Sequence, residues 1–249
     1  MQLMEAASRH GVEKMVCTGS ASSYPSHAPF PLSEQDLFKG LPDVLREAHG
    51  IAKRLAWIQA RAYRQQYGFR CVFLIPTNFY GPGDNFDPKT CYVIPSLIRK
   101  FVEANEDGSD EVVIGGSGCA TRDFLHVDDC AEAIVLALER YAGGDAVNLG
   151  SGIEVGIHDV ARKIARATGY NGRILWDPTY PDGPTRRGRG VTRAQKEFGF
   201  KANKTLVEGL AETVDWYRSI RANAESKSAE TKVFAKGHQR PTAPARGDL

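Results

Sequence analysis

The sequence has few features of membrane, secreted or nucleic-acid-binding proteins. Its 249 residues contain no apolar run approaching the ~20 that cross a bilayer. The first residues, MQLMEAASRHG, carry Glu5 and Arg9 where a secretory signal has an apolar core. A formal net charge of only +2 predicts no general attraction to nucleic acid. These absences favour a cytoplasmic protein that binds neither membrane nor nucleic acid.

Paired cysteines are also absent. The five cysteines are scattered and include no CxxC pair, which argues against both a zinc cage and a disulfide framework. Reduced thiols are the ordinary state of cytoplasmic proteins. The sequence therefore predicts no metal site.

A glycine-rich phosphate loop is missing as well. A dinucleotide-binding domain normally begins with a strand, a glycine-rich turn and a helix whose N-terminus receives the pyrophosphate. Gly115, Gly116 and Gly118 are followed by CATRDF rather than by a helix, and Gly150 and Gly152 lack a third glycine at the right distance. Tight turns explain both clusters better.

Alternating strand and helix patterns are present throughout most of the chain. This alternation predicts an α/β fold in which helices cover a parallel sheet. From about Arg221 the sequence has few large apolar residues, which predicts a disordered tail over 221–249. The expected strands are 12–20, 69–78, 111–116, 123–129, 146–150 and 174–178, and the expected helices are 2–10, 42–67, 92–104, 130–141, 158–169 and 205–220.

Seven segments, in order, resemble the GDP-L-fucose synthase branch of the extended short-chain dehydrogenases/reductases, within the NAD-dependent epimerase/dehydratase family. PTNxYGPxDNF is the most specific of them. Enzymes of this branch epimerise and then reduce GDP-4-keto-6-deoxy-mannose with NADPH. The segments are GSASSYP (19–25), IAK (51–53), FLIPTNFYGPGDNFDP (73–88), VIPSLIRKF (93–101), GSGCATRDFLHVDD (116–129), VNLGSG (147–152) and PDGPTRR (181–187).

The resemblance implies a fold and a set of partners. Residues 1–220 would form one epimerase/dehydratase domain: a Rossmann-like parallel sheet whose first strands are missing from this chain, and a small C-terminal α/β substrate-binding region. Strand 12–20 would then be an open, apolar edge. The implied ligands are NADP, although its glycine-rich loop is absent here, and a GDP-linked nucleotide sugar. The resemblance also implies a homodimer.

The implied catalytic residues include one departure. Ser20 stands at the position of the family serine that hydrogen-bonds the 4-keto oxygen. Lys53 stands where the family lysine contacts the nicotinamide ribose and lowers the pKa of a tyrosine proton donor. His49 occupies the place of that tyrosine. Histidine can act as an acid near neutral pH, but its imidazole is shorter than a phenol, and a Lys53 cation would disfavour the imidazolium.

The implied epimerisation pair has changed too. The family cysteine and histidine correspond to Ser22 and Tyr92 here. A serine hydroxyl is a poor acid–base group unless another group activates it, and a phenol is a poorer base than imidazole at neutral pH. Tyr92 could instead supply the phenol that His49 lacks, if the substrate were placed differently.

The binding residues match the family better. A guanidinium such as that of Arg122 suits phosphate oxygens. Gly115 stands where the family has a tryptophan beside the nucleotide, so preference for guanosine is open. The resemblance assigns cofactor contacts to Thr18, Gly19, Ser20, Lys53, Pro76, Thr77, Asn78 and Phe79, and substrate contacts to Lys100, Arg122, Asp182 and Arg187.

Three functions follow from these observations. The first is an NADP-dependent nucleotide-sugar epimerase/reductase. The second is a relative that binds a nucleotide sugar or a partner subunit without turnover, because the phosphate loop and three reactive side chains are changed together. The third is a different reaction on a related sugar, with His49 as the acid or base.

Overall fold

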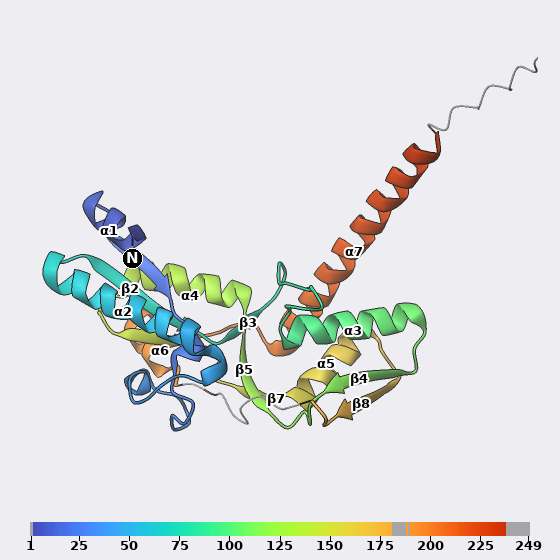
Figure 1. Cartoon of the computed structure of the whole chain (residues 1–249), viewed down its shortest axis with the longest axis horizontal. Helices are drawn as coiled ribbons and strands as arrows, with labels where there is room; N and C mark the ends of the chain where they lie inside the picture. Colours follow the sequence, from blue (N-terminus) through green and yellow to red (C-terminus); the bar gives the residue numbers. More distant parts are fainter. Residues whose placement is uncertain (1, 181–187, 189, 238–249) are drawn as a thin grey trace, which may run out of the picture.

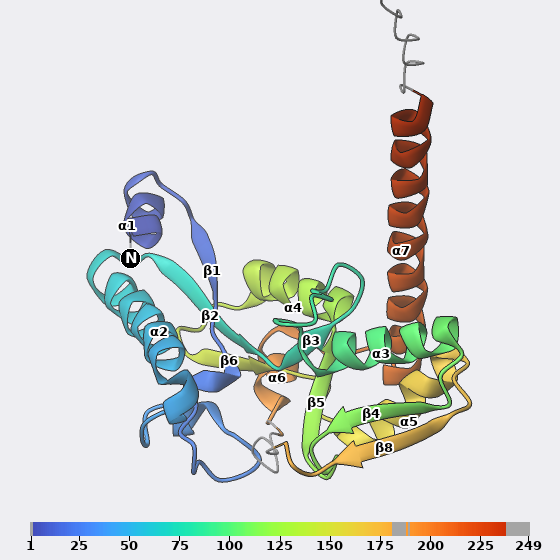
Figure 2. The same cartoon turned by 45° about the vertical axis from the view of Figure 1, so that its right-hand side comes forward.

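Three small sheets and the helices packed on them make up the part of the chain that the structure describes (Figure 1, Figure 2). The computed structural model describes residues 2–180, 188 and 190–237. The strands are β1 Lys14–Thr18, β2 Arg70–Pro76, β3 Asn78–Tyr80, β4 Glu111–Gly115, β5 Thr121–His126, β6 Ala146–Leu149, β7 Glu154–Gly156 and β8 Arg173–Asp177. The helices are α1 Gln2–Arg9, α2 Glu47–Tyr67, α3 Val93–Asp107, α4 Val127–Arg140, α5 Ile157–Thr168, α6 Thr192–Phe198 and α7 Leu206–Gly237, with 3-10 turns at Ala21–Ser23, Glu34–Asp36 and Val44–Arg46.

The first sheet is parallel, in the order β1-β2-β6. Alternate side chains of its central strand, β2, enter two different cores. Val72 and Leu74 pack in a cluster with residues of α4 and α6, whereas Phe73 and Ile75 pack in a cluster that includes Trp57 of α2. Helices therefore cover both faces, which is why β2 is an almost continuous apolar run. The expected parallel sheet wound with helices is confirmed.

β1 is an edge strand among the described residues, as expected for strand 12–20. It pairs with β2 alone, four of its residues are half-buried, and Thr18 is exposed. The ammonium of Lys14 donates to the carbonyl of Ala137 at 2.9 Å, which ties the strand to α4.

The second region contains sheets β3-β5-β7 and β4-β8. Its core lies between α3, α5 and α7 and includes Phe101, Ile164 and Leu210. β5 and β7 are antiparallel, so the chain is not one continuous parallel sheet. This region confirms the small α/β part expected toward the C-terminus.

Element boundaries differ from expectation at three places. α4 begins at Val127, so the last three residues of the expected strand 123–129 are helical, because His126 Nδ1 accepts a hydrogen bond from Asp128 N at 3.3 Å and caps the helix. α2 begins at Glu47 rather than near Pro42, because the Asp43 carboxylate accepts a hydrogen bond from Leu45 N at 2.9 Å and caps a separate 3-10 turn. α7 continues past Ile220 to Gly237 and extends away from the rest of the chain (Figure 1). Residues 238–249 of the expected tail lie outside the described residues.

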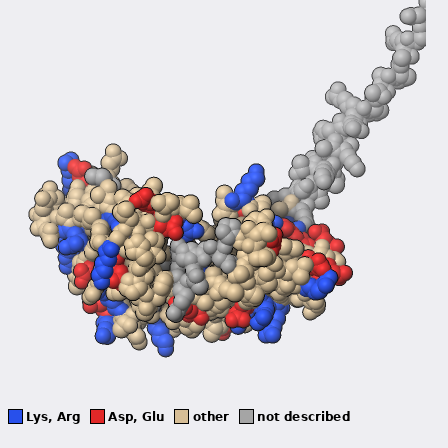
Figure 3. Space-filling view, turned by 60° about the horizontal axis from the view of Figure 1, so that its bottom comes forward, with Lys and Arg blue, Asp and Glu red and all other residues tan. Residues whose placement is uncertain are grey.

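Surface charge and helix composition bear on possible partners. Basic and acidic side chains are interspersed over the described residues of the face in Figure 3, rather than gathered into the basic stripe of a nucleic-acid-binding surface. Within the described ranges, no helix has the length and apolar character needed to cross a membrane.

Candidate functional site

A cavity of about 920 Å³ lies at the carboxyl ends of β1 and β2. This is the edge at which parallel α/β sheets bind their ligands. The cavity brings together residues from five segments: Gly19–Ser22, Val44–His49, Pro76–Tyr80, Asp84 with Cys91–Pro95, and Arg122 with Phe124.

Two serine hydroxyls form one wall of the cavity. Ser20 caps the turn after β1, and its Oγ accepts a hydrogen bond from Ser22 N at 3.3 Å. The two Oγ atoms are 2.7 Å apart, so one hydroxyl donates to the other. Ser22 is buried, whereas Ser20 is half-buried. Ser20 is therefore the hydroxyl better placed to meet a ligand.

His49 lies in the first turn of α2 and is exposed on the cavity wall. Gly50 allows α2 to lie directly against the backbone carbonyl of Ser22, because a Cβ at residue 50 would collide with that oxygen. The buried Arg54 also holds α2 on this loop by donating from Nε to the carbonyl of Ser23 at 2.6 Å. Close packing of α2 on the loop after β1 thus brings His49 to the same cavity as the serines.

Lys53 follows His49 by one helical turn. It does not line the cavity, and its ammonium donates to the carbonyl of Thr18, at the end of β1, at 2.8 Å. Thr18 itself is exposed and does not line the cavity either.

Another part of the cavity wall carries Tyr92, Cys91 and Asp84. Tyr92 is 74% exposed and precedes the first residue of α3. Burial raises the pKa of the Asp84 carboxyl, although a hydrogen bond from the backbone of Asn85 opposes the shift. Sequence reasoning missed Asp84 and Cys91 as cavity residues, even though Asp84 lies within the PTNxYGPxDNF motif and Cys91 is next to Tyr92.

Aromatic stacking fixes the loop that carries this wall. The ring of Phe86 stacks on that of Tyr217 at 4.2 Å and lies 5.9 Å from that of Trp216. Both partners belong to α7, so α7 supports the cavity without lining it.

The segment after β2 forms the floor, and Pro76, Thr77, Asn78 and Phe79 all line the cavity. The hydroxyl of Thr77 and the amide of Asn78 donate to the backbone carbonyl of Asp123, at 2.9 Å and 3.1 Å. These bonds join the end of the first sheet to β5.

Arg122 brings a guanidinium to the cavity from β5 and donates to its neighbour's carbonyl, Thr121 O, at 2.7 Å. The next residue, Asp123, is buried. Its carboxylate accepts hydrogen bonds from the backbone and hydroxyl of Ser151, at 3.0 Å and 2.6 Å, and from Gly152 N at 3.2 Å. The sequence analysis did not identify Asp123 as a residue that supports the site, although it follows Arg122, whose guanidinium suits phosphate oxygens.

Other predicted binding residues lie elsewhere. Lys100 does not line the cavity, and its ammonium donates to the carbonyl of Val113 on β4 at 2.7 Å. The ring of Tyr180 packs beside Gly115, where the resemblance implies an aromatic residue. Asp182 and Arg187 lie outside the described residues.

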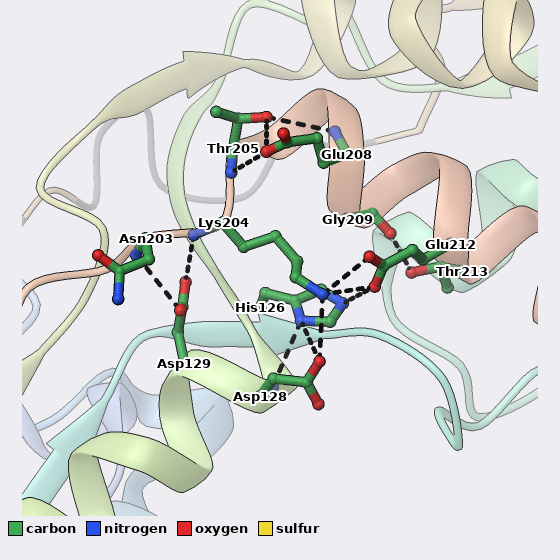
Figure 4. A network of polar contacts seen from close by, with 10 residues as sticks. All are labelled: His126, Asp128, Asp129, Asn203, Lys204, Thr205, Glu208, Gly209, Glu212 and Thr213. Carbon is green, nitrogen blue, oxygen red and sulfur yellow. Dashed lines mark hydrogen bonds and ion pairs between the residues drawn. The ribbon is translucent and has the colours of Figure 1, made fainter.

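A second polar cluster joins β5, α4 and α7 (Figure 4). His126, Asp128 and Glu212 place possible metal-ligand atoms within 4.8 Å of one another. However, the ammonium of Lys204 lies within 3.2 Å of the Asp128 carboxylate and 2.6 Å of that of Glu212. His126 Nδ1 accepts from Asp128 N, so in the neutral ring Nε2 carries the proton and has no lone pair for a metal. The cluster is therefore an ion-pair network.

The His126 network predicts a loss of stability in acid. Burial is the largest cause that lowers the pKa of His126 and the Lys204 ammonium adds to it, while the Asp128, Glu212 and Asp129 carboxylates oppose it. The unfolded chain therefore takes up a proton near pH 6.5, before the folded chain does, and the free energy of unfolding falls as pH drops from about 6.5 through the folded pKa. Each unit of difference in pKa corresponds to about 1.4 kcal/mol.

Urea unfolding at pH 7.5 and pH 5 measures this loss. His126→Asn keeps an acceptor for Asp128 N, so the variant is expected to lose less stability on acidification than the natural chain. His10→Asn, at an exposed position, is the control and should leave the pH dependence unchanged. Equal acid sensitivity in the natural chain and His126→Asn would contradict the assignment.

Comparisons with known proteins agree with this geometry. The model of the NAD dependent epimerase/dehydratase family matches residues 1–150. The chain is 40% identical over 216 residues to the probable GDP-L-fucose synthase 1 of Oryza sativa subsp. japonica, covering 86% of this chain and 66% of that protein. It is 37% identical over 224 residues to GDP-L-fucose synthase of Escherichia coli (strain K12), covering 86% and 70%.

Solved structures show the same relationship. A GDP-L-fucose synthetase from Naegleria fowleri matches with a TM-score of 0.81 at 26% identity, covering 87% of this chain and 68% of that chain. The same enzyme has been solved bound to NADP.

The chain belongs to the NAD dependent epimerase/dehydratase family, with the Rossmann-like α/β fold of these NAD(P)-dependent enzymes. Within it, the relatives reported above are GDP-L-fucose synthases, and the chain spans 66% of the length of the rice protein.

Proposed function

We propose that the chain binds a GDP-linked 4-keto sugar in the 920 Å³ cavity, as part of an NADP-dependent epimerase/reductase like GDP-L-fucose synthase, and that it turns over slowly. The observation that carries the proposal is the meeting of Ser20, His49, Tyr92 and Arg122 on one cavity at the carboxyl edge of a parallel sheet. Similarity to GDP-L-fucose synthases supports the GDP-sugar class.

The described residues fit one end of an NADP molecule. Gly19 and Ser20 after β1, and Pro76 to Phe79 after β2, offer a wall for the nicotinamide, while Lys53 is fixed beside them on Thr18. Within the described ranges no glycine-rich turn leads from a strand into a helix N-terminus, so these residues supply no such contact for the pyrophosphate. When bound, NADPH would supply hydride to the 4-keto carbon.

The side chains around the sugar would orient it and move protons. Ser20 would donate to the 4-keto oxygen, with its own hydroxyl held by Ser22. His49 would have to deliver a proton to that oxygen. Proton transfer requires hydrogen-bond reach of about 2.6–3.2 Å, directly or through one water, and an imidazole ends short of the position a tyrosine hydroxyl would take. This is the physical reason for slow reduction.

Epimerisation would be slow for a related reason. The groups that would face the sugar carbons are the hydroxyl of Ser22 and the phenol of Tyr92, which both line the cavity. Neither is an effective acid–base group at carbon near neutral pH without activation. We therefore expect GDP-4-keto-6-deoxy-mannose and NADPH to give turnover well below ~1 s⁻¹, the lower end of ordinary enzymes. A rate within the ordinary range of about 1–10³ s⁻¹ would overturn the proposal of slow turnover.

Arg122 provides the test of binding. Calorimetric titration of the chain with GDP-mannose is expected to give a saturable isotherm, and Arg122→Ala is expected to weaken it about 10–100-fold, because a hydrogen bond to a charged group contributes roughly 1.5–3 kcal/mol. Arg122→Lys keeps the charge but loses the planar fork, so an intermediate affinity is expected. Lys100→Ala, which removes a basic residue outside the cavity, is the matched control and should leave affinity unchanged. Equal binding by the natural chain and Arg122→Ala would contradict this site.

The base contact and the assembly complete the proposal. The ring of Tyr180 beside Gly115 offers an aromatic surface for the nucleotide.

Pairing of two copies through α2 is proposed from its exposed apolar stripe. This stripe consists of Ile51, Leu55 and Ile58, which follow one another at helical spacing and are 41%, 49% and 46% exposed. A cytoplasmic location is proposed from the scattered free cysteines.

A further inference from the structure

Cys17 and Cys71 lie side by side on β1 and β2, outside the cavity described above. Their Sγ atoms are 3.5 Å apart, and the Cys71 thiol donates to the sulfur of Cys17. Met15 is opposite Cys71 in the register, and Cys17 is two residues further along β1, so both thiols face the same side of the sheet. They contact a cluster under α2 that includes Ala60.

The surroundings of the two sulfurs differ. The hydrogen bond from Cys71 lowers the pKa of the Cys17 thiol to about 7, with help from the positive charge of Lys53 and against the effect of burial. Donating that hydrogen bond, together with burial, raises the pKa of Cys71. Cys17 is half-buried and Cys71 is buried. Cys17 is therefore suited to react as a thiolate nucleophile, whereas Cys71 is expected to stay protonated until Cys17 has reacted.

We propose that Cys17 and Cys71 form a redox-sensitive modification site that hydrogen peroxide converts to a disulfide between β1 and β2. The Cys17 thiolate attacks one peroxide oxygen, the O–O bond breaks, and hydroxide leaves as the sulfenic acid forms. The sulfur of Cys71 then loses its proton and attacks the sulfur of Cys17, the S–O bond breaks, and water leaves. In total, two thiols lose two hydrogens and two electrons, and peroxide becomes two waters.

Closing the bond requires a small shift of β1. Disulfide sulfurs are about 2.05 Å apart, whereas these are 3.5 Å apart. The two residues are diagonal neighbours, and diagonal Cα atoms lie roughly 7–8 Å apart, beyond the usual disulfide range of about 4.4–6.8 Å. β1 pairs with β2 alone in the described part of the chain, so a shift of β1 along β2 would break no hydrogen bond to another strand there. A bond closed in this way is strained and easily reduced.

The site lies next to the catalytic end of the sheet. Thr18, whose carbonyl receives the Lys53 ammonium, directly follows Cys17, and the cavity residues Gly19 and Ser20 come next. A shift of β1 would therefore displace the wall of the cavity. The modification site itself stands independently of the proposed function, because it depends only on the two thiols and their surroundings.

Peroxide treatment of the full chain, followed by intact mass and peptide mapping, tests the proposal. The expected product has lost the mass of two hydrogen atoms, links the Cys17 and Cys71 peptides, and returns to the starting mass with dithiothreitol. Cys17→Ser should form no link, whereas Cys119→Ser, at an exposed and distant thiol, should form the same link as the natural chain. A link through other cysteines, or no link at all, would overturn the proposal.

Two further variants test the first step. In Cys71→Ser the hydroxyl keeps the hydrogen bond to Cys17 but cannot close a disulfide, so dimedone should trap a sulfenic acid at residue 17. In Cys71→Ala the donor is gone, and trapping at residue 17 should be roughly tenfold slower at pH 7, because less thiolate is present. Equal trapping rates in the two variants, or faster trapping at Cys119 than at Cys17 in Cys71→Ser, would show that the pair is not activated.

Discussion

Replacing His49 by tyrosine is expected to raise the rate of 4-keto reduction by about 10²-fold or more, the usual contribution of a positioned general acid. The phenol is longer than the imidazole and starts from the same helical position on the cavity wall. Lys53 already lies one turn along α2, with its ammonium fixed on Thr18 O at 2.8 Å. The substitution therefore extends the side chain of residue 49 toward the 4-keto oxygen and leaves the position of Lys53 unchanged.

The measurement is a single-turnover reaction of the full chain with GDP-4-keto-6-deoxy-mannose and excess NADPH, followed by nicotinamide absorbance. His49→Phe is the matched control, since it adds ring length without a hydroxyl. Parallel titrations of NADPH separate slow chemistry from weak cofactor binding. If His49→Tyr and His49→Phe bind NADPH and react at the same rate, the phenol hydroxyl is not the missing group. If both variants are slower than the natural chain, His49 is itself the working acid of this reduction, and the proposal that it impairs the reaction is wrong.

Replacing Asp123 by asparagine is expected to lower the free energy of unfolding by about 2–3 kcal/mol. The buried carboxylate accepts from Ser151 N, Ser151 Oγ and Gly152 N. An amide group places N–H against one of these donors and leaves it unsatisfied, which costs about 1–3 kcal/mol, more where a charged partner is lost. Since Arg122 precedes Asp123, and Thr77 donates to the Asp123 carbonyl, affinity for GDP-mannose should fall as well.

Urea denaturation of the two proteins measures the change in stability. Asp107→Asn, at the exposed end of α3, removes a carboxylate of the same kind outside the core and should stay within about ±0.5 kcal/mol of the natural chain. A loss in Asp123→Asn no larger than in Asp107→Asn would show that the three hydrogen bonds add little net stability.

Much of the first sheet could be predicted from its residues. FRCVFLIPTN is apolar at consecutive positions, which indicates a strand covered on both faces, and β2 has this environment. The convergence of Ser20 and Asn78 was also predictable, because they follow β1 and β2, and parallel strands end at one edge of a sheet. These features depend on local pattern and chain order alone. Arg122 lies near the start of β5 in another sheet, and only the resemblance assigned it to the site.

Other features depend on contacts that the sequence pattern does not carry. The three-residue strands β3 and β7 exist because β5 pairs with each of them, and their own sequences are too short for a pattern. The position of the Lys53 ammonium depends on a tertiary contact, since it donates to the carbonyl of Thr18 at the end of β1. The 3-10 turn Val44–Arg46 lines the cavity, and the Asp43 cap separates it from α2, although the sequence predicts one helix over 42–67. An aspartate side chain can either cap a new turn or lie within a longer helix, and the sequence pattern does not decide between the two.

The position of Lys204 has a consequence for how the two regions stay joined. Its ammonium lies where a divalent ion would otherwise bridge Asp128 and Glu212, and its backbone N–H is held by Asp129 at 3.1 Å. Because the Lys204 ammonium is part of the chain, its effective concentration at the two carboxylates is set by the backbone and not by the surrounding solution. The junction between α4 and α7 therefore carries its own counter-ion on the chain.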